Sequence, residues 1–222
     1  MITVALAMLA LPTGAALGWL LAPLLSARVP AGEHIATHRR LAAALTGVAF
    51  GLLAWRFGPE PELIAYLVLV AGCVPLAIID ARAGRLPNKL TLSTFAAGLL
   101  LLAANAALGV AGWTALAGAL IGAAALAGMY LVLALANPSG MGLGDVKLAL
   151  PLGLYLGWLG AATWMLGALL GAMFGALAAL ALLASRRASW RSRLPYGPFM
   201  VAGAFTAIAV APLIPELGVS LA

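Results

Sequence analysis

Three long stretches of this chain contain no charged side chain: residues 1–27, 90–144 and 148–185. Of its 222 residues, 65% are hydrophobic and only 8% are charged, whereas a soluble domain carries about 25% charged residues. This is too little polar surface to cover a water-soluble protein. The bilayer must therefore be the solvent for most of the surface. The sequence therefore predicts one membrane domain, residues 1–222, in contact with the lipid bilayer.

Apolar segments divide the chain into eight candidate helices, and most have the roughly 17–25 residues that a transmembrane helix needs. They predict an all-α fold, a polytopic transmembrane bundle of about eight helices. The sixth segment is short and follows a glycine-rich loop. Because non-helical backbone at membrane depth must line a cavity or be buried in protein, residues 137–145 are a candidate site. The predicted segments are 2–26, 41–57, 62–80, 90–109, 112–136, 145–159, 161–184 and 198–215.

Lysine and arginine side chains predict the orientation. The net charge is +6 and the isoelectric point is near 10.3, which in a soluble protein would indicate nucleic-acid binding. Here the basic residues gather in alternate connections, so the positive-inside rule explains them and no nucleic-acid partner is expected. Only Arg56 falls on the opposite side, and the odd-numbered connections are predicted to be cytoplasmic with both termini outside. The cytoplasmic group is Arg28, Arg39, Arg40, Arg82, Arg85, Lys89, Lys147, Arg186, Arg187, Arg191 and Arg193.

Metal and cofactor sites are not expected. Cys73 is the only cysteine and lies in an apolar segment, which excludes a disulfide and a cysteine zinc site. His34 and His38 are four residues apart, but no third or fourth ligand lies near them in the sequence. The N-terminus is apolar from Ile2 and lacks a basic stretch, so we expect a retained first helix rather than a cleaved signal peptide.

Glycines recur at four-residue spacing in two of the predicted helices. Gly118 and Gly122 give one such step, and Gly167, Gly171 and Gly175 give two more. In membranes this spacing lets helices approach closely, so the glycines predict helix packing rather than a functional site.

Asp80 and Asp145 are the acidic residues that the loops do not explain. Glu33, Glu60 and Glu62 fit solvated loops and Glu216 fits the C-terminal tail, whereas each aspartate adjoins an apolar run. A carboxylate at the centre of a membrane helix costs about 2.5–3.5 kcal/mol on insertion scales, so such a residue is a functional hypothesis by default. The predicted topology places both carboxylates at the cytoplasmic edge. Two converging carboxylates can share a proton, one acting as base on water and the other as acid toward a carbonyl.

Helix polarity predicts different roles for the two aspartates. Asp145 begins a predicted helix, where the helix dipole favours the ionised form, and Asp80 ends one, where the dipole disfavours charge. The shared proton is therefore expected mainly on Asp80. Gly142 and Gly144 are expected to supply backbone conformations closed to other residues and to let a substrate strand approach.

Three sequence blocks resemble those of the prepilin peptidases, also called type IV leader peptidases. Gly-Met-Gly-Leu-Gly-Asp-Val-Lys-Leu, residues 140–148, looks like the GxGD signature of that family. Ile79-Asp80 followed by Leu-Pro-Asn-Lys-Leu-Thr, residues 86–91, is similar to its first aspartate block. Leu-Pro-Tyr-Gly-Pro-Phe, residues 194–199, resembles its third block. The blocks occur in family order and cover residues from about 62 to 205.

This resemblance implies a membrane aspartyl endopeptidase of the bacterial inner (plasma) membrane. It would remove leader peptides from type IV prepilins or pseudopilins at the cytoplasmic face, just before the substrate's hydrophobic helix, without a metal. Its catalytic residues map onto Asp80 and Asp145. Residues of the three blocks expected to bind substrate or shape the site are Pro87, Asn88, Gly142, Gly144, Lys147, Pro195, Gly197 and Pro198.

The N-terminal region departs from the fuller members of the family. Those members carry a loop with paired CxxC motifs after the first helix, and many also N-methylate the product. Residues 28–33 resemble the start of that loop, but the chain then runs to Arg39 without a cysteine. We therefore interpret 1–60 as a reduced N-terminal helical pair without the cysteine module and 61–222 as the GxGD peptidase core. Peptide cleavage is expected, and N-methylation stays open.

Two other functions fit part of the pattern. Presenilin-like intramembrane proteases share the GxGD sequence but pair it with Tyr-Asp and Pro-Ala-Leu motifs, where this chain has Ile79-Asp80 and Pro-Tyr-Gly-Pro at 195–198. A proton-coupled small transporter could use both aspartates, yet transporters commonly show internal repeats with a site near the midplane. No repeat is evident here.

Overall fold

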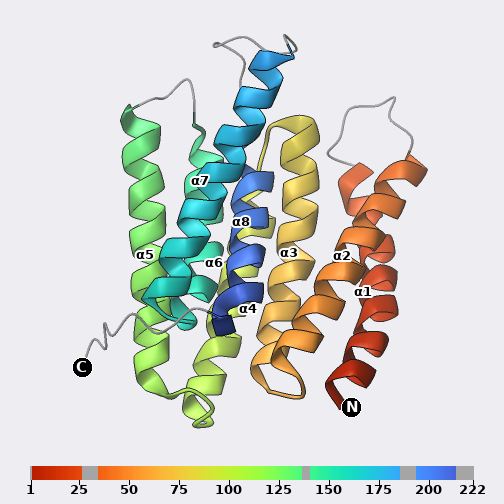
Figure 1. The fold of residues 1–222 in the computed structure, drawn as a ribbon, viewed down its shortest axis with the longest axis vertical. Coiled ribbons are helices and arrows are strands. Elements are labelled where there is room, and N and C mark those ends of the chain that lie inside the picture. The colour runs from red at the N-terminus through yellow and green to blue at the C-terminus, as the bar shows by residue number, and fades with distance from the viewer. Residues whose placement is uncertain (1, 27–34, 137–140, 186–193, 214–222) are drawn as a thin grey trace. The chain divides into compact units, whose positions relative to one another are not determined.

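The computed structural model describes residues 2–26, 35–136, 141–185 and 194–213, which form α-helices and one short 3-10 helix (Figure 1). No strand occurs within these ranges. The chain divides into two compact units, unit 1 (Met1–Leu116) and unit 2 (Ala117–Ala222), and each is described by itself. The all-α expectation is confirmed, with eight α-helices in the described part of the chain.

Unit 1 consists of helices that pack in chain order, α1 on α2, α2 on α3 and α3 on α4, with a further contact of α1 on α3. Glycine allows the closest approach within the α1–α2 hairpin, because a Cβ atom built at Gly18 would lie 2.5 Å from the carbonyl oxygen of Ala42. The helices are α1 (Ile2–Ser26), α2 (Ile35–Phe57), α3 (Glu62–Ala83) and α4 (Asn88–Ala107).

Unit 2 is held together by the glycines that the sequence assigned to packing. A Cβ atom at Gly122 would lie 2.5 Å from the carbonyl oxygen of Gly153, and one at Gly157 would lie 2.4 Å from that of Gly118. The indole Nε1 of Trp164 donates to the Gly122 carbonyl at 2.9 Å, which adds α7 to this contact. The helices are α5 (Gly112–Ala136), which begins in unit 1, α6 (Leu143–Trp158), α7 (Ala161–Ala184) and α8 (Gly197–Val210), followed by a 3-10 turn (Ala211–Leu213).

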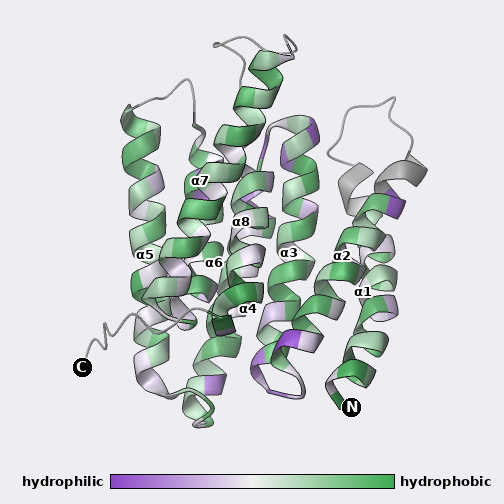
Figure 2. Ribbon diagram, viewed as in Figure 1, coloured by the Kyte–Doolittle hydropathy of each residue, from purple (hydrophilic) through white to green (hydrophobic). Residues whose placement is uncertain are grey.

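Within the described ranges, six helices are long and apolar enough to cross a membrane: α1 to α5 and α7. Figure 2 shows hydrophobic residues along most of their length and hydrophilic ones mainly near helix ends and connections. Large apolar side chains such as Leu20 and Leu100, each 72% exposed, need lipid rather than water around them. The chain is therefore a polytopic membrane protein. α6 and α8 are shorter, with 16 and 14 residues.

The observed helix bounds correct the predicted ones mainly at α2. This helix begins at Ile35 rather than at residue 41, so Arg39 and Arg40 lie in its first turns instead of in a loop. The Arg39 guanidinium lies 5.2 Å from the centre of the Trp19 ring. A long basic side chain can thus extend a helix beyond its apolar run by packing its stem and keeping its charge at the interface.

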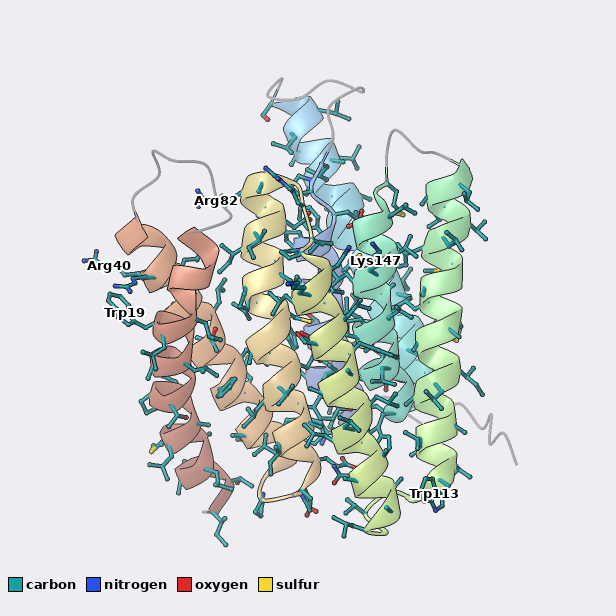
Figure 3. All side chains as sticks on the ribbon, turned by 180° about the vertical axis from the view of Figure 1, so that it is seen from behind. Trp19, Arg40, Arg82, Trp113 and Lys147 are labelled. Carbon is teal, nitrogen blue, oxygen red and sulfur yellow. The ribbon has the colours of Figure 1, made fainter. Side chains whose placement is uncertain are left out.

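The basic residues of unit 1 gather at one end of its helices. Figure 3 shows Arg40 near Trp19 at one end of the α1–α2 hairpin and Arg82 at the end of α3. Arg85 follows in the α3–α4 connection and Lys89 in the first turn of α4, while Arg56 is near the opposite end of α2. The predicted grouping therefore holds within unit 1. Several residues named above lie outside the described ranges: Arg28, Glu33, His34, Gly140, Arg186, Arg187, Arg191, Arg193 and Glu216, as does the side chain of His38.

Candidate active site

Asp80 lies in the last turn of α3 and only 5% of it is exposed. Gly84 ends this helix in the left-handed conformation, φ 58° and ψ 33°, and its N–H donates to the Asp80 carbonyl oxygen at 2.9 Å. Glycine suits this position because other residues are strained at positive φ. The prediction that Asp80 sits at the C-terminal end of a helix is confirmed, and its carboxyl is buried there.

The proline block forms the turn that follows Asp80 and starts α4. Pro87 has φ −65° and ψ 119°, and α4 begins at Asn88. The Thr91 hydroxyl donates to the Pro87 carbonyl at 3.2 Å, and the Thr91 N–H donates to the same oxygen at 3.1 Å. Asn88 and Lys89 are exposed. The block thus fixes where the chain turns after Asp80, and the roles of Pro87 and Asn88 toward a substrate stay predictions.

An apolar groove of about 550 Å³ runs between α1, α3 and α4 of unit 1. Its lining includes Leu21, Val68 and Pro75, with Lys89 as its charged member. Ile79, the neighbour of Asp80, also lines it. The groove therefore reaches the residue that precedes this aspartate.

Asp145 lies at the third position of α6 and is 8% exposed. The Gly142 N–H donates to its Oδ2 at 3.1 Å, and the Asp145 N–H donates to the Gly142 carbonyl at 3.1 Å. This reciprocal pair is how an acidic residue commonly closes a helix N-terminus, where the dipole favours a negative charge. The predicted place of Asp145 at a helix start is confirmed.

The conformational freedom expected of Gly142 and Gly144 is not used. Gly142 has φ −91° and ψ 154°, an extended conformation open to any residue, and Gly144 lies within α6. That expectation is wrong because the turn closes through the Asp145 carboxylate rather than through a left-handed backbone. Lys147, labelled in Figure 3, is half-buried two residues further along α6. Residues two apart on a helix do not lie on the same face.

Two tyrosines near Asp145 were not singled out from the sequence. Tyr130 of α5 is 3% exposed, and its ring centre lies 5.9 Å from that of Tyr196, which precedes α8. A side-chain hydrogen bond joins the two phenols, and the Asp145 carboxylate acts electrostatically on both of them. The sequence did point to Tyr196 in one way, because it belongs to the third block, from which Pro195, Gly197 and Pro198 were predicted to shape the site.

The third block holds Tyr196 in place. Gly197 and Pro198 open α8, and the N–H groups of Phe199 and Met200 donate to the Tyr196 carbonyl at 3.1 and 3.2 Å. Pro195 precedes the tyrosine and is half-buried. Burial raises the pKa of the Tyr196 phenol, the hydrogen bond with Tyr130 lowers it in part, and the negative charge of Asp145 raises it again. The phenol is therefore a protonated hydrogen-bond donor at neutral pH.

The sequence of the chain matches the Type IV leader peptidase family over residues 67–212. This match includes both aspartates and all three sequence blocks. The chain belongs to the Type IV leader peptidase family. The resemblance read from the three blocks is thereby confirmed for most of the chain.

Several curated relatives carry the name prepilin leader peptidase/N-methyltransferase. The one from Stutzerimonas stutzeri is 31% identical over 165 residues, 73% of this chain and 55% of the relative. The one from Burkholderia pseudomallei strain 1026b is 34% identical over 184 residues, 79% of this chain and 54% of the relative. The one from Pseudomonas putida is 29% identical over 201 residues, 86% of this chain and 67% of the relative. The chain thus spans about half the length of the first two. No solved structure matches it.

Proposed function

We propose that this protein is an aspartyl endopeptidase that removes leader peptides from prepilin-like or pseudopilin substrates. Asp80 and Asp145 would form its catalytic pair. The observation that carries the proposal is the burial of both carboxyls, 5% and 8% exposed, at helix ends of a chain of this family. A buried carboxyl in a membrane protein is costly unless it has a function or a partner.

The reaction needs one carboxylate and one carboxylic acid. Asp145, at a helix N-terminus, would take a proton from water as the water oxygen attacks the carbonyl carbon of the scissile peptide. Asp80, at a helix C-terminus, would give its proton to the carbonyl oxygen. The proton held by Asp145 then passes to the amide nitrogen, the C–N bond breaks, and the new N-terminus leaves as an amine. As the C–N bond breaks, the carbonyl of the new carboxyl reforms and the hydroxyl proton that Asp80 had donated returns to Asp80, so Asp145 is again ionised and Asp80 again protonated.

The substrate is proposed to enter from the cytoplasmic side. In unit 1 the basic residues gather at the end of α3 that carries Asp80, and the positive-inside rule assigns such an end to the cytoplasm. A leader emerging there would meet the aspartates before its hydrophobic helix enters the bilayer. The loop cations then act as topology anchors, and the inner membrane of a bacterium is the proposed location.

Processing of a co-expressed prepilin-like reporter tests the activity. The reporter carries a basic leader followed by an apolar helix, and its mature N-terminus is read by mass spectrometry. We expect cleavage just before the helix with the wild-type protein, loss of cleavage with Asp80→Ala and with Asp145→Ala, and normal cleavage with the exposed-residue control Glu60→Gln. Cleavage that survives in both aspartate variants would defeat the peptidase assignment.

The same spectra separate the alternatives. A cut within the apolar helix would favour a presenilin-like protease, and an uncut reporter with every variant would favour a transporter. The relatives are also named N-methyltransferases, but this chain lacks the cysteine loop of the fuller family members. We expect an unmethylated product, and a mass increase of one methylene at the new N-terminus would contradict this.

A further inference from the structure

The apolar groove between α1, α3 and α4 has no role in the proposed chemistry, although it lies along the helix that carries Asp80. On α3 it extends from Val68 to Ile79, about 16 Å at 1.5 Å per residue. Both α3 and α4 are long and apolar enough to cross a membrane. The groove therefore lies at membrane depth, where a bound molecule would be surrounded by lipid rather than by water.

The interior of the groove offers apolar contacts and no spare hydroxyl proton. Ser93 and Thr94 are lining residues, and their hydroxyls donate to the Leu90 carbonyl oxygen at 3.0 and 2.8 Å. A molecule in the groove therefore finds both hydroxyl protons already used. The part of that molecule that lies in the groove should be apolar, because a buried polar group without a hydrogen-bond partner is costly.

A positive charge stands at one end of the groove. Lys89, in the first turn of α4, is an exposed lining residue, and none of the described lining residues is acidic. Arg82 and Arg85 are exposed at the same end of unit 1, and Figure 3 shows Arg82 there. Basic pockets between transmembrane helices bind anionic lipid head groups. A molecule that is apolar along its length and negative at this end matches both features.

The groove is too narrow to enclose a transmembrane helix. Its volume of about 550 Å³ over a length of about 16 Å corresponds to a mean cross-section of about 34 Å². An α-helix 10–12 Å across has a cross-section of roughly 80–110 Å². An extended hydrocarbon chain is thinner than a helix with its side chains. The basic leader of the proposed substrate would also be repelled by Lys89.

We propose that this groove binds one acyl chain of an anionic phospholipid, with the ammonium group of Lys89 donating to the lipid phosphate. The chain lies along α3 and α4 and contacts Leu21 of α1. This inference does not depend on the peptidase activity. Ile79 lines the groove and directly precedes Asp80, so the bound lipid covers this side of α3 and leaves a substrate to reach Asp80 from another side.

Native mass spectrometry of the full chain, released from detergent micelles, measures the first lipid-binding step. The probes are phosphatidylglycerol, which is anionic, and phosphatidylcholine, which has the same acyl chains and no net charge. We expect the wild type to bind phosphatidylglycerol about fivefold more tightly, the effect of one basic residue near an anionic head group. Lys89→Gln should remove this preference. Arg40→Gln removes a charge at the same end of unit 1 but outside the lining, and should keep it.

Filling the groove tests the place of the acyl chain. Ala97→Leu puts a larger side chain into the lining, so the first binding step of both lipids should be lost. Ala96→Leu is the matched control, because Ala96 is exposed on the same helix and lies outside the lining. Ser93→Leu is a second lining variant, used if thermal unfolding in detergent shows that Ala97→Leu does not fold.

Several outcomes would overturn the inference. They are a wild type without preference for phosphatidylglycerol, a preference that survives Lys89→Gln, an equal loss of preference in Arg40→Gln, and unaltered binding in a folded lining variant.

The apolar helix of the reporter, added as a peptide, is the final arm. We expect phosphatidylglycerol to stay bound to the wild type in its presence. Displacement of the lipid by this peptide would assign the groove to the substrate and overturn the lipid site. No arm requires cleavage, so a protein that cleaves no reporter refutes the proposed function and leaves the lipid measurement decisive.

Discussion

Among single residues, the two aspartates differ in the helix end that each occupies. Asp145 receives the Gly142 N–H at the start of α6, while Asp80 lies in the last turn of α3, where the free groups are carbonyl oxygens. The first environment favours a negative charge and the second disfavours it. In the proposed mechanism, this asymmetry would supply a base and an acid from two chemically identical side chains.

The location of the shared proton follows from that asymmetry. We expect the substrate-free protein to hold it mainly on Asp80, because the helix dipole and the Gly142 hydrogen bond both favour ionised Asp145. Infrared titration of Asp80→Asn and Asp145→Asn at intermediate pH measures this. The protonated carboxyl band should disappear in Asp80→Asn and persist in Asp145→Asn. The reverse pattern would contradict the assignment.

Among helices, close packing through glycine determines how unit 2 positions its site. α5 and α6 approach so closely at Gly122 and Gly153 that no side chain fits between their backbones. α6 carries Asp145 and α5 carries Tyr130, so this contact determines the position of one helix, and of its side chain, relative to the other. In a bilayer, where helices gain little from leaving lipid, such contact is a main source of helix association.

A single methyl group tests the α5–α6 contact. Gly122→Ala places a Cβ atom 2.5 Å from the Gly153 carbonyl oxygen and 2.8 Å from the Gly157 Cα. We expect it to destabilise the fold by about 1–3 kcal/mol through overpacking. Gly128→Ala, on the same helix with nothing within 4 Å of the new Cβ, is the control and should leave stability nearly unchanged. Thermal unfolding in detergent measures both, and equal stability of the two variants would argue against the contact.

For the whole molecule, charge and apolar length were enough to predict most of the fold and the position of both aspartates. Asp80 and Asp145 stand out because a carboxylate beside an apolar run needs an explanation. The start of α2 was missed because Arg39 and Arg40 read as loop residues, although Arg39 packs on Trp19. The Tyr130–Tyr196 pair could not be predicted, since it joins residues of α5 and the α8 start only after folding, and a tyrosine in an apolar segment looks ordinary.

Membrane orientation is a prediction about the whole chain. In a Cys73→Ala background, we expect Glu60→Cys to react with an impermeant maleimide added to intact cells, because it lies at the poorly basic end of unit 1. Arg85→Cys, at the basic end, should react only after the inner face is opened. Both positions are exposed, so lack of labelling would not reflect burial. The opposite pattern would place Asp80 at the outer face and contradict cytoplasmic processing.

Reporter turnover by the purified protein in lipid nanodiscs tests most directly whether Asp80 and Asp145 act as one catalytic pair. Residues that act as a unit show strongly non-additive losses, because removing either one already removes the mechanism. We predict that Asp80→Asn and Asp145→Asn each lower kcat by at least about 1,000-fold, within the range seen when a catalytic residue that acts in a unit is removed. The double variant should be no slower than the slower single variant. The pair would be contradicted if the double variant lost kcat by the product of the two single losses. A single variant with kcat within about tenfold of wild type would also contradict it.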